Sequence, residues 1–391
     1  MIPVSEALAR LFALVKPVGT ETVALTEAVG RVLAEDAVAR RTQPPFAASA
    51  MDGYAVRAHE AVLGAVLPVI GESAAGRRHQ GALPEGAAIR IFTGAPVPEG
   101  ADAILIQENA TREGDQITIT GAPEAGAFIR PAGGDFKAGD RLSAPSRLSP
   151  RDIALLASMD LPRLRVAERP RVALIATGDE LVLPGEEAGP DQIISSNNFG
   201  LAAMLTEIGA EPILCPIARD SRESLLAALD TARGADFIVT LGGASVGEHD
   251  LVAEIFGEAG LSLDFWKIRM RPGKPLMVGE VAGAVMLGLP GNPVSAMVCG
   301  EIFLRPAVDA AMGLPARPRA TRTAQLAHAI GRNGAREHYM RANIGEDGRA
   351  SVFDNQDSSL LATLAGANAL VIRAPDAPEL PEGAEIRYIP L

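Results

Sequence analysis

The sequence predicts an α/β multidomain protein with a central domain built on a parallel sheet and further domains that are mostly β. Three observations support this prediction. Continuous apolar runs alternate with helical patterns through residues 170–316, which is typical of a parallel sheet. Short β-like runs separated by glycine and proline fill residues 46–140 and return in residues 317–391. The chain has 391 residues, so one core cannot contain it.

Helical patterns lie on both sides of the first β-rich stretch. Apolar residues recur at helical spacing between Val4 and Val15, which predicts an amphipathic helix. A second helix is expected after Ser149, which can cap it, with Pro150 at the first helical position. The short apolar runs between these helices are residues 89–92, 103–106 and 116–120.

The central stretch repeats a strand and a helix four times. Its strands lack alternation, which predicts burial on both faces, and they span residues 172–176, 212–218, 237–241 and 285–289. The helices that follow them carry apolar residues on one face and include residues 201–208, 221–232, 251–259 and 294–303. Three later strands are expected at residues 350–353, 369–373 and 386–389. The predicted division is domain I at 1–45 and 141–169, domain II at 46–140, domain III at 170–316, and domain IV at 317–391.

Composition excludes several classes of function. The net charge of −12 removes the general attraction that duplex nucleic acid or an anionic membrane requires, so neither is an expected partner. Only two cysteines are present, which supports neither a disulfide framework nor a structural zinc site. No run of 18 apolar residues occurs, and the first residues lack the pattern of a signal peptide. A cytoplasmic protein is expected.

Polar residues gather where the central strands end. The turn after the third strand, LGGASVGEHD, contains Gly242, Gly243, Ser245, Gly247 and Asp250. Its glycines let backbone N–H groups approach a phosphate, although a single loop of this kind is more often an ordinary turn with Asp250 as a helix cap. Four polar strand ends on one rim of the sheet favour ligand binding, because ligands of parallel sheets bind there.

Three carboxylates belong to separate strand ends. Glu180, Asp220 and Asp250 would provide the oxygen-rich surroundings that Mg²⁺ bound to phosphates requires. Each could instead complement the dipole at the start of a helix. Their convergence on a phosphate-binding turn favours the metal-binding interpretation for the set.

A cluster of cations interrupts the otherwise acidic sequence. Lys267, Arg269, Arg271 and Lys274 occur around a tight Pro-Gly-Lys-Pro turn and could bind phosphate or another oxyanion. The alternation of the first three also fits one solvated strand face. The turn of Pro290, Gly291, Asn292 and Pro293 leads directly into a helix, so its backbone N–H groups would face an anion. The turn would lose little conformational freedom on binding, because its prolines already restrict the backbone.

Six motifs occur in an order that resembles the molybdopterin molybdenumtransferase (MoeA) family, whose fold also forms the E domain of gephyrin. They are SAMDGYA (49–55), TGAPVP (93–98), TGDEL (177–181), GGASVGEHD (242–250), RPGKP (271–275) and LPGNPVSA (289–296). The resemblance implies the last step of molybdenum cofactor synthesis. Adenylylated molybdopterin and molybdate would give the cofactor and AMP in a Mg²⁺-dependent reaction.

The resemblance also implies roles for individual residues, among them Asp52 and Thr93, which composition leaves without a function. It assigns catalysis to Asp52, Thr93, Glu180, Asp220 and Asp250, and the metal to the last three. Asp52 and Thr93 lie in domain II, so a homodimer would have to bring them to domain III of the partner. For molybdate and the cofactor it points to Lys274, residues 290–293, Ser295, Arg341 and Ser358, in addition to the cations and glycines named above.

Partners and alternatives follow from the same resemblance. A separate molybdopterin adenylyltransferase would supply the substrate, and molybdoenzymes or carriers would accept the cofactor. A first alternative is that the chain is itself such an adenylyltransferase, because that domain shares the Gly-rich turn. A second alternative is a non-catalytic, gephyrin-like scaffold.

Overall fold

A six-stranded sheet forms the centre of the computed structural model, which describes residues 1–243 and 251–391. Its strand order is β18-β15-β19-β23-β22-β20. The first four strands are parallel, and they are β18 (Glu211–Leu214), β15 (Arg171–Ala176), β19 (Phe237–Leu241) and β23 (Ala284–Leu289). The last two are antiparallel, and they are β22 (Met277–Val281) and β20 (Ser262–Trp266). The predicted parallel sheet is therefore extended by a mixed edge.

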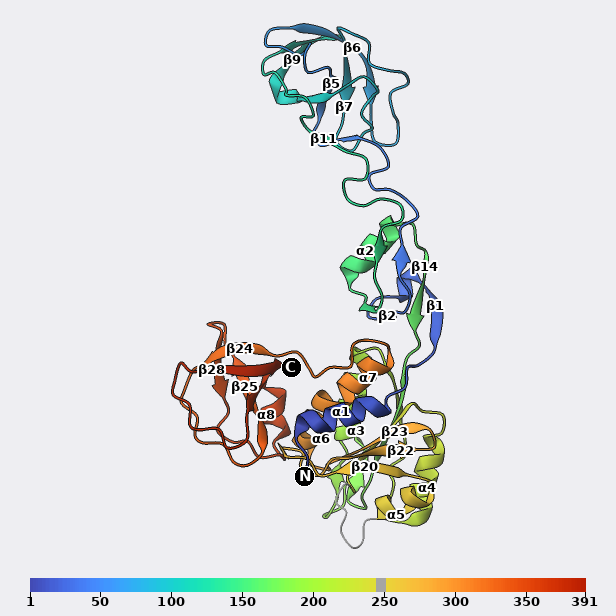
Figure 1. The fold of residues 1–391 in the computed structure, drawn as a ribbon, viewed down its shortest axis with the longest axis vertical. Helices are drawn as coiled ribbons and strands as arrows, with labels where there is room; N and C mark the ends of the chain where they lie inside the picture. The colour runs from blue at the N-terminus through green and yellow to red at the C-terminus, as the bar shows by residue number, and fades with distance from the viewer. Residues whose placement is uncertain (244–250) are drawn as a thin grey trace.

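Helices cover both faces of this sheet (Figure 1). Val172 and Leu174 of β15 point into one core, while Ala173 and Ile175 point into the other, as alternation along a strand requires. The first core contains α1 (Val4–Leu14), α3 (Asn197–Glu207), α6 (Pro293–Cys299) and α7 (Arg305–Ala311). The second core contains α4 (Arg222–Thr231) and α5 (Leu251–Glu258). The helix near the N-terminus thus packs into a core of the α/β unit, to which Val32 and Ala167 of the following small sheet also contribute.

Two expectations about the central elements were wrong in detail. The second predicted strand, 212–218, ends at Leu214 and forms an edge of the sheet, so its side chains are exposed or half-buried. An apolar run in an edge strand cannot be told from a buried one by composition alone. The last predicted helix, 294–303, passes from α6 into a π-helical turn at Gly300–Leu304 before α7.

A small sheet with order β1-β14-β2-β13 connects the α/β unit to the rest of the chain. Its strands are β1 (Thr20–Ala24), β14 (Arg163–Ala167), β2 (Val32–Leu33) and β13 (Ser146–Arg147), and a 3₁₀ turn, Leu25–Glu27, follows β1. Helix α2 (Pro150–Ser158) packs against it. Ser149 accepts a hydrogen bond from the Asp152 N–H at 3.3 Å, so the predicted cap is confirmed.

A second β unit lies at the far end of the molecule (Figure 1). It contains a six-stranded sheet of β8 (Ala103–Ile106), β5 (Gly53–Val56), β7 (Ala88–Ile91), β6 (Val66–Ser73), β10 (Gln116–Ile119) and β9 (Ala110–Glu113), with a 3₁₀ turn at Gln107–Asn109. Two short ribbons join it to the small sheet and pair β3 (Ala37–Val38) with β12 (Arg141–Leu142), and β4 (Ala48–Ser49) with β11 (Ile129–Arg130). The predicted β insertion is thus present and extends away from the α/β unit.

The remaining β unit lies beside the α/β unit (Figure 1). Its strands are β24 (Arg322–Leu326), β25 (Glu337–Ile344), β26 (Arg349–Val352), β27 (Ala369–Arg373) and β28 (Glu385–Pro390), and α8 (Leu361–Ala365) follows a loop after β26. The short strand β21 (Met270–Arg271), which comes from the α/β unit, pairs with β25. This pairing ties the two units together.

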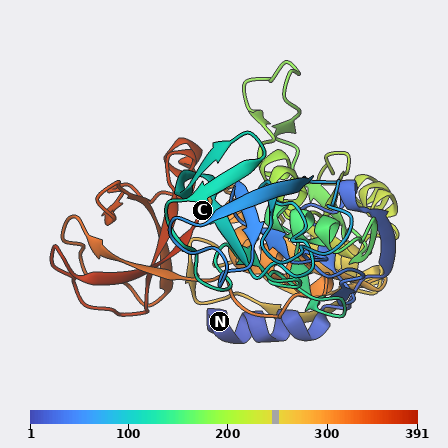
Figure 2. The same ribbon diagram turned by 90° about the horizontal axis from the view of Figure 1, so that it is seen from above.

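A short paired segment projects from the α/β unit beside the strand ends. Strands β16 (Leu181–Val182) and β17 (Ile193–Ile194) pair with each other, and Figure 2 shows this light-green segment standing out from the body of the molecule. Across the described ranges, none of the helices has the length and apolar character needed to cross a membrane.

Candidate active site

A pocket of about 570 Å³ opens at the carboxyl ends of β15, β19 and β23. Its walls come from the three strand ends, from β17 and the start of α3, and from Pro275 and Ser359. Of the predicted site residues, it contains Glu180, Gly242, Gly243, Pro290, Gly291, Asn292 and Pro293. Three of the four predicted strand ends therefore line one pocket, while Asp220, which follows the fourth, is not among the lining residues.

Backbone contacts bring the strand ends into close register. The Gly242 N–H donates to the Leu289 carbonyl at 3.1 Å, and the Thr177 N–H donates to the Leu241 carbonyl at 3.0 Å. Gly242 has a φ of 99°, and a Cβ there would lie 2.8 Å from Oγ1 of Thr177. Only glycine fits this position without strain, so the backbone itself forms this wall of the pocket.

The turn after β23 is held from two directions. The Asn197 Nδ2 at the start of α3 donates to the Gly291 carbonyl at 2.7 Å. The Asn292 Nδ2 donates to Oγ of Ser358 at 2.9 Å, and the Val294 N–H donates to the Ser358 carbonyl at 3.0 Å. The turn is thus fixed between α3 and the loop that precedes α8.

Carboxylates lie at the other side of the strand ends. The Asp220 N–H donates to Oδ1 of Asp179 at 3.1 Å, and Nη1 of Arg219 donates to the carbonyls of Gly178, Asp179 and Leu181. Burial, Asp179 and Glu180 raise the pKa of Asp220 above its ordinary value. Asp179 is a member of this acidic group that sequence reasoning passed over, although it stands next to Glu180 in the same turn.

Three predicted residues of the phosphate-binding turn, Ser245, Gly247 and Asp250, fall outside the described residues. Within the described ranges, no group of three or more His, Cys, Asp or Glu side chains is close enough together to hold a metal ion. Glu180 and Asp220 supply hard oxygen donors, which is the donor chemistry that Mg²⁺ favours, and, in addition to burial, the negative charge of Glu180 helps to raise the pKa of Asp220.

The predicted cations surround a turn between β20 and β22. Lys267 places Nζ 3.4 Å from the centre of the Trp266 ring, while Arg271 and Lys274 are exposed. Gly273 has a φ of 100° and packs against Sγ of Cys299 in α6, where no Cβ could be accommodated. Pro275, next to Lys274, lines the pocket. Only Met270 and Arg271 form a strand, so the alternative of one long solvated strand face does not describe this segment.

Arg341 and Ser295 are buried. Arg341, on β25, is 1% exposed and donates to the side chain of Gln356 and to the carbonyls of Asn355 and Leu360. Ser295, on α6, is 4% exposed. Ser358, by contrast, lies directly on the Asn292 turn.

Asp52 and Thr93 form a pair in the distant β unit. Oδ1 of Asp52 accepts hydrogen bonds from the Thr93 N–H at 2.7 Å and from its hydroxyl at 2.8 Å. These bonds lower the pKa of Asp52. Strands β5 and β7, next to which the pair lies, are at the end of the molecule opposite β23 (Figure 1). The structure brings the two residues together but keeps them away from the pocket of their own chain.

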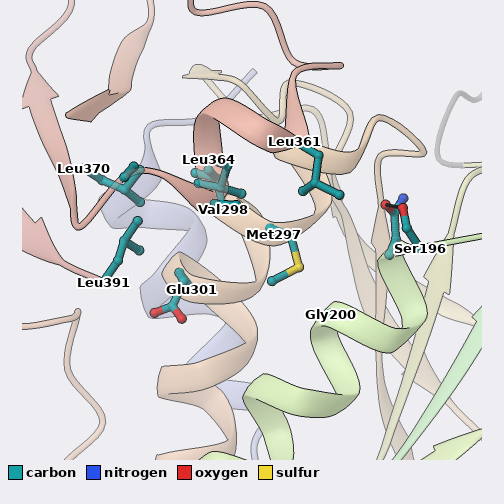
Figure 3. Close-up of a pocket in the computed structure, with 12 residues that line it drawn as sticks. Ser196, Gly200, Met297, Val298, Glu301, Leu361, Leu364, Leu370 and Leu391 are labelled. Atoms are coloured by element: carbon teal, nitrogen blue, oxygen red, sulfur yellow. Dashed lines mark hydrogen bonds between the residues drawn. The ribbon is translucent and has the colours of Figure 1, made fainter. Parts of the chain in front are cut away.

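A second, apolar pocket of about 330 Å³ shares Ser196 and Asn197 with the first. It lies between α3, α6 and α8, and Figure 3 shows Leu361 and Leu364 of α8 facing Met297 and Val298 of α6. The carboxylate of Glu301 lies at its lower edge in the same view and pairs with Arg305 and Arg319.

Family models match three parts of the chain. Residues 2–159 match the MoeA N-terminal region (domain I and II), residues 173–310 match a probable molybdopterin binding domain, and residues 323–391 match the MoeA C-terminal region (domain IV). A molybdopterin biosynthesis MoeA protein from Pyrococcus horikoshii has a similar structure, with a TM-score of 0.88 and 29% identity over 100% of both chains.

Two curated relatives are similar over nearly the whole length. Molybdopterin molybdenumtransferase 2 of Mycobacterium tuberculosis is 38% identical over 380 residues, covering 94% of this chain and 94% of the relative. Molybdopterin molybdenumtransferase of Haemophilus influenzae is 35% identical over 366 residues, covering 91% and 90%. The fold and these matches together define a multidomain enzyme of molybdenum cofactor biosynthesis, whose α/β unit matches the model of a probable molybdopterin binding domain. The chain belongs to the molybdopterin molybdenumtransferase family.

Proposed function

We propose that this chain inserts molybdenum from molybdate into adenylylated molybdopterin and releases AMP, using Mg²⁺. Family membership places the chain at the molybdenum insertion step of cofactor biosynthesis. The observation that carries the finer proposal is the pocket at the three strand ends. It combines close-approach glycines, a fixed turn and the Glu180 carboxylate, which suit a substrate with a pyrophosphate group bound through a cation.

Within this proposal, the strand-end backbone holds the phosphates. Gly242 and Gly243 present main chain without a side chain in front of it, and the 290–293 turn is rigid because Asn197 and Ser358 hold it. Ser245 and Gly247 follow the two glycines in sequence and are proposed to bind the same phosphates. A pocket fixed before binding loses little conformational entropy when the substrate enters.

Glu180 and Asp220 would hold Mg²⁺ together with Asp250. When bound, Mg²⁺ would neutralise charge on the pyrophosphate. Asp179 and Arg219 keep the acidic turns in place through the hydrogen bonds described above. The raised pKa of Asp220 supports this role, because a bound cation would compensate the negative charge that now surrounds this carboxyl.

Molybdate is the proposed second substrate, and cationic side chains together with hydroxyl or amide donors would bind this oxyanion. Lys274 stands beside Pro275 at the pocket wall, and Lys267 and Arg271 flank the same turn. Ser358 contacts the Asn292 turn from the other side. Ser295 lies just beyond that turn, on α6. A tetrahedral dianion suits these hard donors.

Two chains are proposed to complete each site. Asp52 and Thr93 are joined to each other at the end of the molecule opposite the pocket, so they can serve catalysis only in another copy of the chain. A homodimer in which domain II of one chain covers domain III of its partner would satisfy this requirement. The proposed domain division, with its long connection between these two units, is compatible with such an exchange.

The proposal also defines what the chain exchanges with other proteins. A molybdopterin adenylyltransferase would supply the adenylylated substrate, and molybdoenzymes or carriers would receive the cofactor. The compartment proposed for this exchange is the cytoplasm.

The direct test incubates purified protein with adenylylated molybdopterin, Mg²⁺ and molybdate. We expect AMP to appear only when all three are present, together with cofactor that activates an apo-molybdoenzyme. Incubation with molybdopterin and Mg-ATP should form no adenylate. Formation of adenylate would instead support the adenylyltransferase alternative, and absence of AMP in the complete mixture would support a non-catalytic scaffold.

A further inference from the structure

The loop between β26 and α8 is clamped to β25 by one amide side chain. Oε1 of Gln356 accepts hydrogen bonds from the backbone N–H of Arg341 at 2.9 Å and from its Nε at 3.2 Å. Nε2 of Gln356 donates to the carbonyl of Arg341 at 3.0 Å and to that of Phe353 at 2.7 Å. Four hydrogen bonds thus fix the loop two residues before Ser358.

The guanidinium of Arg341 completes this clamp. Its Nη1 donates to the Leu360 carbonyl at 3.2 Å, and its Nη2 donates to the Asn355 carbonyl at 3.3 Å. Asn355 and Leu360 lie on either side of Ser358, so Arg341 spans the tip of the loop. Because Arg341 is only 1% exposed, its charge faces the loop backbone and not solvent.

The tip of the loop rests on the active-site turn. Ser358 accepts hydrogen bonds from Asn292 and Val294, and the neighbouring Ser359 lines the strand-end pocket. The Asn292 turn is in turn held by Asn197 of α3. Hydrogen bonds therefore hold Gln356 to β25 and Ser358 to the wall of the pocket, and two peptide units of the loop connect these two sets.

We infer that Gln356 is a positioning residue, which together with Arg341 holds Ser358 and Ser359 in place for oxyanion binding, and that Arg341 serves this clamp without touching the oxyanion. The inference rests on the proposed function and adds to it a residue that the sequence motifs did not single out. Arg341 provides donors to three acceptors in a fixed planar arrangement, which Lys cannot reproduce.

The test compares KM for molybdate and kcat for AMP release across a set of variants. Gln356→Met removes all the polar contacts at similar size, and Gln356→Glu keeps the acceptor oxygens while losing the donors. We expect Gln356→Met to raise KM for molybdate about tenfold with kcat changed less than twofold. The substitution displaces the loop that would bind molybdate but leaves the residues of the catalytic step in place. Gln356→Glu should lie between Gln356→Met and the unsubstituted protein. The Kd of the adenylylated pterin should change much less than KM for molybdate in both, because Gly242, Gly243 and the Asn197 contact to the turn stay in place.

Arg341→Lys separates positioning from direct binding, because it preserves the charge. It should raise KM for molybdate as much as Gln356→Met does, and the double variant should be no worse than either single variant. Asn333→Leu is the matched control, since Asn333 Nδ2 donates to the carbonyls of Arg336, Arg373 and Ala374 in the same β unit, away from the loop. It should leave KM unchanged.

The outcomes separate this inference from the proposed function. If the unsubstituted protein releases AMP but Gln356→Met retains its KM for molybdate, the positioning role is wrong. If Arg341→Lys retains the normal KM while Arg341→Met raises it, Arg341 binds the oxyanion through its charge and the inference is also overturned. If the unsubstituted protein releases no AMP with molybdate present, the proposed function itself fails, and with it this inference.

Discussion

The surroundings of Asp220 give the clearest indication that a cation binds beside the strand-end pocket. Its backbone N–H donates a hydrogen bond to Oδ1 of Asp179. The negative charges of Asp179 and Glu180 oppose ionisation of the Asp220 carboxyl group. Together with burial, they raise its pKa, so the folded chain opposes ionisation of this group. A protein that keeps such an arrangement retains charge repulsion that a bound cation would relieve.

Asp220→Asn should therefore stabilise the metal-free protein at neutral pH. The folded-state pKa of Asp220 is raised, so ionisation of this group lowers the free energy of unfolding at pH values above that pKa. At low pH the group is protonated in both the folded and the unfolded chain, so the effect disappears. We expect a melting temperature about 1–2 °C higher than that of the unsubstituted protein at pH 7, with the difference vanishing as the pH falls below about 4. Mg²⁺ should raise the melting temperature of the unsubstituted protein more than that of the variant.

The control for this experiment is Glu113→Gln, which removes an exposed carboxylate on β9 far from the pocket. It should show neither the pH-dependent gain nor the loss of the Mg²⁺ effect. A lower melting temperature for Asp220→Asn at pH 7 would contradict the account of the acidic group.

Single residues also show where sequence reasoning reaches its limit. Glu180 and Asp220 were predicted from their positions after two strands, and the structure brings them close enough for Glu180 to add to the effect of burial in raising the pKa of Asp220, although only Glu180 lines the pocket. Asp179 and Gln356 were passed over, because their roles depend on hydrogen bonds to backbone that is remote in sequence. Arg341 carries a charge that suggests a ligand, but its burial and its acceptors are properties of the folded chain alone.

Among the elements, the turn after β19 depends most strictly on its sequence. Gly242 has a positive φ and lies against Thr177, so a Cβ would clash with the end of β15. Gly242→Ala should lower the free energy of unfolding by about 1–3 kcal/mol and weaken binding of the adenylylated pterin, because both the strain and the clash fall at the pocket wall. Chemical denaturation and calorimetric titration would measure the two effects.

Gly257→Ala provides the matched control. Gly257 lies in α5, and no heavy atom lies within 4 Å of a Cβ built there. The same substitution should therefore raise the free energy of unfolding by roughly 0.5–1 kcal/mol through helix propensity, with no change in pterin affinity. Equal effects of the two substitutions would mean that Gly242 has no special place in the pocket.

Elements with strong periodicity were well predicted. The helix Val4–Leu14, the strand Phe237–Leu241 and the capped helix after Ser149 appear where the pattern indicated. The antiparallel edge of the central sheet was missed, because strand direction follows from tertiary packing and leaves no periodic signal. The same cause explains β21, a strand of two residues that exists only through its pairing with β25.

At the scale of the whole molecule, the position of the distant β unit decides how a complete site can form. Sequence patterns marked this unit as a β insertion, but they could not show how far it extends from the α/β unit (Figure 1). The need for a second chain came from the family resemblance, and the separation of Asp52 and Thr93 from the strand-end pocket supports it. We propose that two copies of the chain share each site.

Mixed dimers test this claim most directly. Two differently tagged chains are co-expressed, one with Asp52→Asn and one with Asp220→Asn, and the heterodimer is isolated by both tags. If sites are shared, one of its two sites is intact, so molybdate-dependent AMP release should be about half that of the unsubstituted dimer, while both variant homodimers are inactive. A heterodimer with both substitutions in one chain should be inactive. An inactive first heterodimer together with a half-active second one would show that each chain forms its own site and would contradict the account.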